Sequence, residues 1–533
     1  MSPTESRVVL FGLDGAGFPI LDPMLRDGTM PNLAAVLDAG VAAPLRSTEH
    51  PLSPPAWASI MTGRPPGEHG IFDFVRLDHS GGTPAYTLIS SADLRVPTVF
   101  DIASRHGRRV TALNFPCMFP PPALNGSVVP GYVPWSYLGR ACHPRGLFRT
   151  LKEQARIEPR KLAVDWELER TAIQGLPADQ LSRWVRLHVE REEQWGRILL
   201  HLMRSEPSDL TAVVLDGVDR IQHLCLHLLV AEPEDLTPEE RDVRSACRDY
   251  FRVADGLLGE VLAAAGPDAD LLVVSDHGAQ LAGDRIFYAN TWLAQHGLLT
   301  WHDDVAVDDA SRVAMNGNTE STQLFDWDHT SAAALTSSSN AIVVHRATHR
   351  GLPGVPPEEY EAFCRRLRED LLTARDPATG ERIVARVLLR DEAFPGPAAD
   401  GAPDLTLELR SPGFLSVLRG PDVMAARVRP YGTHHRDGVF IAYGPGIAPG
   451  TVLRPLSVVD VAATVLHLLG LPIPAGVAGQ PAVDGMRPAV RAPRPDEEQR
   501  ADVLTAVGVP PKGLDAAGEA EIVSRLRSLG YLE

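Results

Sequence analysis

Short apolar runs, rich in β-branched residues, recur along the chain and end in small or polar residues. Runs of this length and composition predict buried strands. They cover residues 8–13, 110–114, 211–215, 271–275 and 439–443. The spacing between them leaves room for helices, so the pattern predicts strands that alternate with helices.

One of the segments between the strands has apolar residues at steps of three and four, the repeat of a helix with one buried face. It runs from Val243 through Cys247, Tyr250 and Ala254 to Val261. Alternating strands and helices predict an α/β fold with a mostly parallel central sheet and helices on both of its faces. In such sheets ligands bind at the carboxyl ends of the strands.

The chain has 533 residues, enough for one large domain with insertions. We assign residues 1–486 to a catalytic domain with a charged helical insertion at about 135–205 and a polar loop insertion at about 300–345. Two roles are open for the helical insertion: a cap over the substrate, or a surface addition without contact to the site. Residues 487–533 are predicted to be a linker and a short C-terminal helix.

Residues with metal-binding chemistry follow the predicted strands. Asp14 ends the first strand in LFGLDGAG, where Gly15 and Gly17 allow a carboxylate to approach a metal closely, although Asp-Gly alone is more often a plain turn. Asp219 and His223 in VLDGVDRIQH are four residues apart, so a helix places both on one face. An exposed Asp–His pair is common on helices, but this pair directly follows a strand.

Two further motifs belong to the same pattern. Asp276 and His277 end the buried strand of LLVVSDHG, for which a turn with a capping Asp is the alternative. His434 and His435 in YGTHHRDGVF precede a strand, and either of them is a candidate ligand, the other then being solvated or placed behind it.

Ser53 in HPLSPPAWASIMTG is the candidate nucleophile. It lies in a proline-rich turn ahead of a helix expected from about Ala56. A serine here is often only an N-cap, but a helix N-terminus also offers N–H donors and a positive dipole end to a phosphate. We therefore expect the first helical turn to add N–H donors to the site.

Together these motifs contain three carboxylates, at least two imidazoles and one hydroxyl, enough to bind two divalent ions and to activate an alkoxide. Mixed oxygen and imidazole ligands suit Zn²⁺ or Mn²⁺ better than a pure Ca²⁺ or Mg²⁺ site. The cofactors predicted are two divalent metal ions, with Zn²⁺ first and Mn²⁺ second.

The net charge and the cysteine content limit which binding partners and which cellular location we expect. The formal net charge of −17 is spread along the chain and argues against a nucleic acid polymer as partner. Five cysteines without CxxC spacing predict reduced, mostly buried thiols rather than disulfides. No leader or membrane-spanning pattern is seen, so we expect a cytoplasmic protein that binds a small phosphorylated substrate and no membrane.

The ordered set LDGAG, SPPAWASIMTG, DRIQH, SDHG and GTHHRDG resembles the alkaline phosphatase superfamily. The resemblance covers most of residues 6–486 and is strongest to the type I phosphodiesterase/nucleotide pyrophosphatase branch, in particular its bacterial predicted phosphohydrolases and phosphomutases. It implies a metal-dependent phosphoric ester hydrolase that forms a phosphoserine at Ser53.

The resemblance also implies a ligand assignment. One metal would be held by Asp219, His223 and His434, where His434 is preferred over His435 because of its place after Gly-Thr. The other would be held by Asp14, Asp276 and His277, with the Ser53 Oγ as a further ligand.

Two positions depart from related enzymes. Nucleotide pyrophosphatases usually have an Asn three residues after the nucleophile, where this chain has Ala56, so nucleotide specificity does not transfer simply. Sulfatases need an Arg four residues after it, where this chain has Trp57, which makes sulfatase activity a poor expectation. Candidates to contact the substrate are Trp57, Phe72, Phe74, Asn114 and His435, with core packing as the alternative for the aromatic residues.

Two other functions remain open at this point. A phosphomonoesterase or phosphomutase acting on a small metabolite would use the same residues. An inactive metal-binding protein of the same fold is an alternative of another class, although every ligand-type position is occupied.

Overall fold

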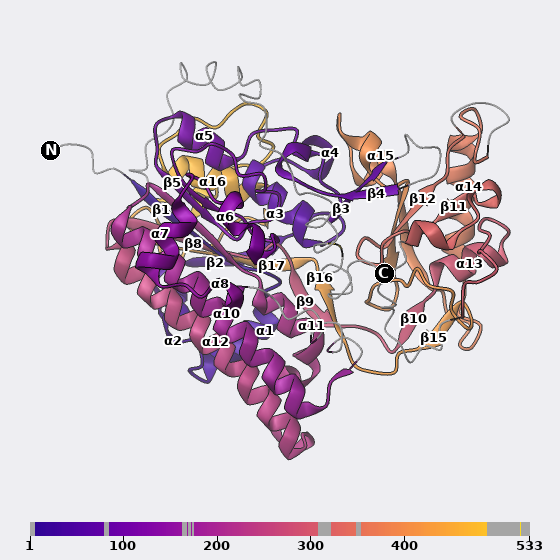
Figure 1. The fold of residues 1–533 in the computed structure, drawn as a ribbon, viewed down its shortest axis with the longest axis horizontal. Helices are drawn as coiled ribbons and strands as arrows, with labels where there is room; N and C mark the ends of the chain where they lie inside the picture. Colours follow the sequence, from indigo (N-terminus) through magenta and orange to yellow (C-terminus); the bar gives the residue numbers. More distant parts are fainter. Residues whose placement is uncertain are drawn as a thin grey trace.

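The protein is described by a computed structural model that covers residues 6–78, 85–162, 175–307, 321–347 and 353–487, together with Leu168, Ala172 and Val523. These residues form a large α/β domain and a smaller lobe, which lies to the right of the sheet in Figure 1. The linker and helix predicted for 487–533 fall outside the described residues, apart from Arg487 and Val523.

An eight-stranded sheet forms the centre of the large domain. Every strand in it except β17 runs in the same direction. Across the sheet the strands are β18 (Leu456–Ser457), β2 (Val41–Arg46), β17 (Asp437–Tyr443), β8 (Ala269–Val274), β1 (Arg7–Leu13), β7 (Leu210–Leu215), β5 (Val110–Leu113) and β6 (Gly126–Val129). The five apolar runs of the sequence are β1, β5, β7, β8 and β17, so the predicted mostly parallel α/β fold is confirmed.

Helices cover both faces of the sheet because each central strand is apolar on both sides. In β1, Phe11 and Leu13 pack into one layer and Val8 and Leu10 into the other. The first layer contains α1 (Phe18–Arg26), α2 (Pro31–Ala39), α10 (Ala178–Ser205), α11 (Gly217–Val230) and α12 (Pro238–Ala265). The second layer contains α3 (Ser53–Thr62), α5 (Val99–Arg105) and α16 (Asp460–Leu468).

The helix predicted from the period between Val243 and Val261 is α12. Its start is set by a capping box in which the Thr237 side chain accepts from the Glu240 N–H group and the Glu240 side chain binds back to Thr237. Helices α10 and α12 lie side by side along the sheet (Figure 1). Shorter helices in the connections are α4 (Pro66–His69), α6 (Leu138–Ala141), α7 (Leu147–Thr150) and α8 (Pro159–Leu162).

The segment expected as a helical insertion contributes α10. This helix is neither a cap over the substrate nor a surface addition. Trp184, Val185 and Trp195 of this helix are buried in the same core as the sheet. Helix α10 is therefore part of the layer that supports the sheet.

Residues 285–426 contain the smaller lobe, which the sequence analysis did not predict. It has an antiparallel sheet of β11 (Ala332–Ala333), β12 (Ala341–Val344), β14 (Leu405–Leu409) and β13 (Val384–Leu389), and a strand pair β10 (Arg285–Phe287) and β15 (Met424–Ala426). Its helices are α13 (Ala289–Gln295), α14 (Tyr360–Thr373) and α15 (Arg390–Ala393). A separate apolar core holds it together.

Further strand pairs link these parts: β3 (Val75–Asp78) with β4 (Ala85–Leu88), and β9 (Gly278–Leu281) with β16 (Gly432–His435). All five cysteines are buried and free, as predicted. None of the helices in the described part of the chain is both long and apolar enough to cross a bilayer.

Candidate active site

Parallel strands bring the predicted ligands together. Strands β7, β1 and β8 are neighbours that run in one direction, so their carboxyl ends share an edge of the sheet. Asp14 follows β1, Asp276 and His277 follow β8, and α11, which follows β7, carries Asp219 and His223.

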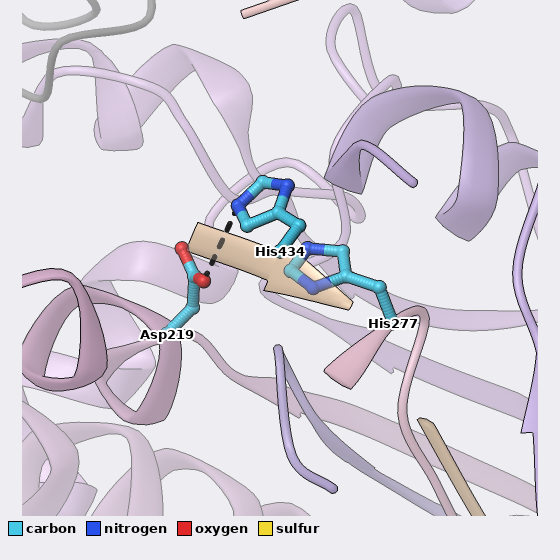
Figure 2. A group of neighbouring side chains, drawn as sticks. All are labelled: Asp219, His277 and His434. Carbon is cyan, nitrogen blue, oxygen red and sulfur yellow. Dashed lines mark ion pairs between the residues drawn. The ribbon is translucent and has the colours of Figure 1, made fainter. Parts of the chain in front are cut away.

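His434 reaches the same edge by a different route. Strand β17 runs opposite to its neighbours, so the residues before it lie where the other strands end. In β16, His434 pairs with Ala279 of β9, directly after the SDHG motif. The rings of His277 and His434 therefore stack, with centroids 3.8 Å apart, and Figure 2 shows both turned toward Asp219.

Ser53 is the first residue of α3, three residues earlier than the predicted helix start. Its Oγ donates to Asp14 Oδ1 over 3.3 Å and lies 3.3 Å from His277 Nε2. The N-cap of α3 is Leu52, and no side chain caps it, so Ser53 does not act as the N-cap. The hydroxyl instead lies among the predicted ligands.

The expected set of N–H donors in the first turn of α3 is wrong. Pro54 and Pro55 have no N–H group, and the Ala56 N–H donates to the Leu52 carbonyl over 3.1 Å. Of the residues in this turn, only Ser53 can offer its own N–H group to a phosphate.

Two groups of side chains in the described residues have the spacing of metal ligands. They are Asp14, Asp276 and His277, and Asp219, His277 and His434, with the ligand atoms of each group within 4.8 Å of one another. The first group is one of the two ligand sets expected from the resemblance. The second contains His277 where His223 was expected.

His223 nevertheless belongs to the same cluster. Its Nε2 lies 3.3 Å from Asp219 Oδ2 and 3.2 Å from His434 Nε2. The Oδ1 of Asp219 lies 3.5 Å from His434 Nε2, the pair marked in Figure 2. All six predicted ligands and Ser53 therefore converge.

Backbone carbonyls set the tautomer of the three imidazoles. The Nδ1 atoms of His223, His277 and His434 lie 2.8, 3.0 and 2.7 Å from the carbonyls of Gly432, Gly278 and Pro51. A carbonyl only accepts, so each Nδ1 carries a proton, and in the neutral ring each Nε2 then turns its lone pair to the cluster. This is the arrangement of metal-bound histidines.

The carboxylates of the cluster are buried close together. This raises the free energy of the folded protein, and a bound cation would offset it. Burial raises the pKa of Asp14 well above its usual value, and the charges of Asp276 and Asp219 raise it further. Burial raises the pKa of Asp276 to about 7. Burial of Asp219 acts in the same direction, but in the metal-free site the charge and hydrogen bond of a protonated His223, together with His434, outweigh it and hold the pKa of Asp219 well below its usual value.

The Oδ2 atom of Asp276 is buried without a hydrogen-bond partner among the described residues. Its other oxygen, Oδ1, accepts from the Gly15 N–H group over 3.1 Å. A buried carboxylate oxygen without a donor, beside three imidazole lone pairs, fits a divalent cation. The residues present therefore fit a divalent metal ion.

Gly15 is required where β1 meets α11. It has a φ of +72°, and a Cβ atom at this position would lie 2.9 Å from Asp219 Oδ1. The glycine of the Asp-Gly pair is thus explained by the approach of a second carboxylate, which the alternative of a plain turn does not require.

A cleft of about 400 Å³ opens beside this cluster, between the large domain and the smaller lobe. Its wall includes His434 and His435 of the large domain and Phe414 of the lobe. The Nδ1 of His435 accepts from the Asp437 N–H group over 3.1 Å, so the proton of the neutral ring is on Nε2. His435 can therefore donate a hydrogen bond, whereas the Nε2 of His434 cannot.

The family model described as Type I phosphodiesterase / nucleotide pyrophosphatase matches residues 8–437, which is most of the chain. The chain belongs to this family. The predicted membership of the alkaline phosphatase superfamily is confirmed, and so is the prediction of an enzyme in the class of phosphoric ester hydrolases.

Solved structures share the fold of this chain. Phosphonoacetate hydrolase from Sinorhizobium meliloti 1021, in complex with phosphonoformate, has 18% identity and a TM-score of 0.52, over 87% of this chain and 96% of that one. An inactive variant of murine ectonucleotide pyrophosphatase / phosphodiesterase 5, in complex with AMP, has 13% identity and a TM-score of 0.51, over 88% and 96%. At these identities the similarity shows the fold. The search of curated proteins found no match to the chain.

Two of the predicted substrate contacts have other partners in this family member. Trp57 is fully buried, and its Nε1 donates to Asp14 Oδ2 over 3.1 Å. Asn114 is also fully buried and donates to the Val214 carbonyl over 2.8 Å and to Asp216 Oδ1 over 3.1 Å. Phe72 packs against Phe394 and Phe74 against Tyr132, with centroids 5.2 and 5.9 Å apart. A role in substrate binding stays a prediction for these four residues.

The residues that support the site from behind carry no sequence motif. Asp216 at the start of α11 is buried between Arg191 of α10, which contacts its Oδ1, and Arg220, whose Nη2 lies 2.9 Å from its Oδ2. No motif marks Arg191, because it comes from a helix in the segment expected as an insertion. The aromatic rings of Tyr431 and Phe414, which pack on His223 and His434, also lack a motif.

Proposed function

We propose that this phosphoric ester hydrolase is a metal-dependent phosphodiesterase that acts through a phospho-Ser53 intermediate. The proposal rests mainly on one observation: the Ser53 Oγ lies 3.3 Å from both Asp14 Oδ1 and His277 Nε2. A hydroxyl placed among ligand atoms at a helix start is where a metal-activated nucleophile is needed.

Two divalent ions would be held by this chain, with Zn²⁺ preferred and Mn²⁺ second because the ligands mix carboxylate with imidazole. Asp219, His223 and His434 would hold one, and Asp14, Asp276 and His277, with the Ser53 Oγ, would hold the other. When bound, such ions supply positive charge that lowers the pKa of a hydroxyl and neutralises phosphoryl oxygens.

The steps assigned to the residues of this chain are few. Asp14 and His277 hold the Ser53 hydroxyl in place. The Ser53 Oγ forms a bond to phosphorus as the bond from phosphorus to the ester oxygen breaks, and the hydroxyl proton, which Oγ donates to Asp14 Oδ1, passes to the leaving oxygen. A water oxygen then bonds to phosphorus from the opposite side as the bond to Oγ breaks, and a water proton returns to Oγ. His435, with a proton on Nε2 at the wall of the cleft, is placed to donate a hydrogen bond to the phosphoryl group or its substituent.

The cleft favours a diester over a monoester as substrate. A diester carries a second substituent, which needs room next to the reacting phosphorus. The cleft of about 400 Å³ starts at His434 and supplies that room. The substrate proposed is a small phosphorylated molecule, and the expected cytoplasmic location stays a prediction.

A paired assay tests this function. Purified protein is treated with chelator, reloaded with Zn²⁺ or Mn²⁺, and assayed with bis-p-nitrophenyl and mono-p-nitrophenyl phosphate. We expect the diester to be cleaved faster, only in the presence of metal. Ser53→Ala should lower kcat/KM at least about a thousandfold, the order seen when a nucleophile is removed.

The control is Ser205→Ala, which removes an exposed hydroxyl at the end of α10. Rapid quenching and mass spectrometry should find one phosphoryl group on the Ser53 peptide of the wild-type protein. Wild-type rates in Ser53→Ala, or equal rates with and without metal, would refute the proposal.

A further inference from the structure

The cleft next to the metal cluster has charged walls that the proposed reaction does not use. On the large-domain side they include Arg46, Glu49 and Arg436, and on the side of the lobe Arg386, Glu408 and Arg410. Since His434 lies in the same wall, a substrate held at the metal cluster would place its second substituent between these groups.

Some of these charges neutralise one another. Glu49 contacts Arg386 of the lobe and lies 2.9 Å from the Nη2 of Arg436. Glu408 lies 3.0 Å from the Nε of Arg386. Two arginines and two glutamates therefore form a balanced network that joins the lobe to the large domain at the cleft.

Arg46 and Arg410 lie outside this network. Within the described residues, neither side chain forms an ion pair or a hydrogen bond, and both residues are exposed at the cleft. Asp437 is the cross-strand neighbour of Arg46 in β17 but makes no ion pair with it. The two guanidinium groups come from opposite walls, one from the end of β2 and one from just after β14.

This excess of positive charge stands out against the rest of the chain. The formal net charge is −17, so an anion approaching most of the surface is repelled. The cleft wall holds four arginines against Glu49, Glu408 and Asp437, so it keeps a net positive charge beside the candidate metal ligands and attracts an anion locally. Guanidinium groups also bind carboxylate and phosphate in a two-point geometry.

We propose that Arg46 and Arg410 bind an anionic group, carboxylate or phosphate, on the second substituent of the diester substrate. This inference rests on the proposed phosphodiesterase function and narrows its substrate class. It makes the two arginines specificity-determining residues and leaves the chemistry at Ser53 unchanged.

Matched substrates test the proposal. We would compare 4-nitrophenyl ethyl phosphate with its 2-carboxyethyl and 2-phosphoethyl counterparts, using metal-loaded protein. The wild-type kcat/KM should be higher for the anionic substrates. In Arg46→Gln and Arg410→Gln this preference should fall roughly tenfold each, the usual effect of losing one charge-assisted hydrogen bond. The carboxylate and phosphate arms show which anion is preferred.

Arg105→Gln is the control, because it removes one exposed charge at the end of α5, ahead of β5 and so at the opposite edge of the sheet. It should keep the wild-type preference. A second readout avoids turnover: calorimetric titration of the three substrates into metal-loaded Ser53→Ala protein, with and without the arginine changes. Tighter binding of the anionic substrates that disappears in Arg46→Gln/Arg410→Gln supports the proposal.

The outcomes separate the two proposals. If the wild-type protein cleaves all three substrates equally and the arginine variants change nothing, the anionic site is refuted and the phosphodiesterase function stands. If no substrate is cleaved, the proposed function fails. The calorimetric comparison then decides by itself whether the cleft selects an anionic group.

Discussion

At the scale of single residues, the site is set by groups behind the ligands as much as by the ligands themselves. Backbone carbonyls hold the Nδ1 protons of His223, His277 and His434, which leaves three Nε2 lone pairs aimed at the cluster. The indole of Trp57 orients Asp14 by donating a hydrogen bond to its Oδ2. Such outer contacts orient a ligand and tune its affinity for a metal.

Replacing Trp57 by Phe tests this role of the indole. The variant keeps an aromatic ring in the core but removes the donor to Asp14. We expect Zn²⁺ affinity to fall by about tenfold, as for other contacts behind metal ligands. Competition with a chromophoric chelator measures it. Trp292→Phe in the core of the lobe is the control, and equal affinities in the two variants would contradict the assignment.

Gly15 gives a second test at this scale, with Gly17 as its internal control. An alanine at position 15 would need a φ of +72° and would press on Asp219. We expect Gly15→Ala to cost about 1–2 kcal/mol of stability from the left-handed backbone alone and to weaken metal binding. At Gly17 a Cβ would meet its nearest atom at 3.5 Å, an ordinary contact. Urea unfolding with and without Zn²⁺ should separate the two variants, and equal losses would count against the close approach.

At the scale of elements, the cluster depends on strands ending together and on helices that hold their neighbours in place. Helix α11 begins directly after β7, and its start is fixed by Asp216 between Arg191 and Arg220. All three side chains are buried. Removing one partner of such a group leaves a buried charge that the others compensate poorly.

Arg191→Met should therefore destabilise the fold. We expect a loss of about 3 kcal/mol, the lower end of the cost of breaking a buried ion pair, because Arg220 still pairs with Asp216. Arg186→Met is the matched control, as Arg186 is exposed on the same helix. Urea denaturation curves of both variants would show it. If Arg191→Met lost no more free energy of unfolding than Arg186→Met, the contact of Arg191 with Asp216 would not stabilise the fold.

These elements also show what the sequence can predict. Strands β1, β7 and β8 are short apolar runs buried on both faces, and polar residues directly after them must lie at one edge, so Asp14, Asp276 and His277 were predictable. Only the family resemblance favours His434 over His435. The pairing of β16 with β9 that brings His434 to the site joins segments far apart in the chain, which a local pattern does not reveal.

At the scale of the whole molecule, the smaller lobe was not predictable for a related reason. Its shortest strand has two residues. Its apolar core is formed by side chains from several segments between residues 287 and 423. Such short pieces lack a period that marks them as strands. The cleft between the lobe and the large domain, with Arg410 and Arg386 in its wall, was missed with it.

The metal cluster should also affect the stability of the whole chain. We expect it to destabilise the fold when no metal is bound and to stabilise it when metal is bound. Without a cation, burial of the Asp14 and Asp276 carboxylates opposes folding, and the charge of Asp276 adds repulsion at Asp14. A bound ion removes this repulsion and adds about 2.7 kcal/mol when its concentration is a hundred times its Kd. We expect the thermal midpoint to rise with Zn²⁺ and to fall with chelator.

Asp276→Asn distinguishes this effect from non-specific metal binding, because it removes one of the repelling charges and one ligand together. In chelator the variant should be at least as stable as the wild-type protein, and in Zn²⁺ it should be less stable. The protein with the higher thermal midpoint in calorimetric scans should thus change from Asp276→Asn to the wild-type protein when metal is added. Elemental analysis should show fewer ions per chain in Asp276→Asn. Asp268→Asn, an exposed change before β8, should leave the wild-type response intact. If Asp276→Asn were less stable under both conditions, with an unchanged metal content, its carboxylate would be a structural group and not a ligand.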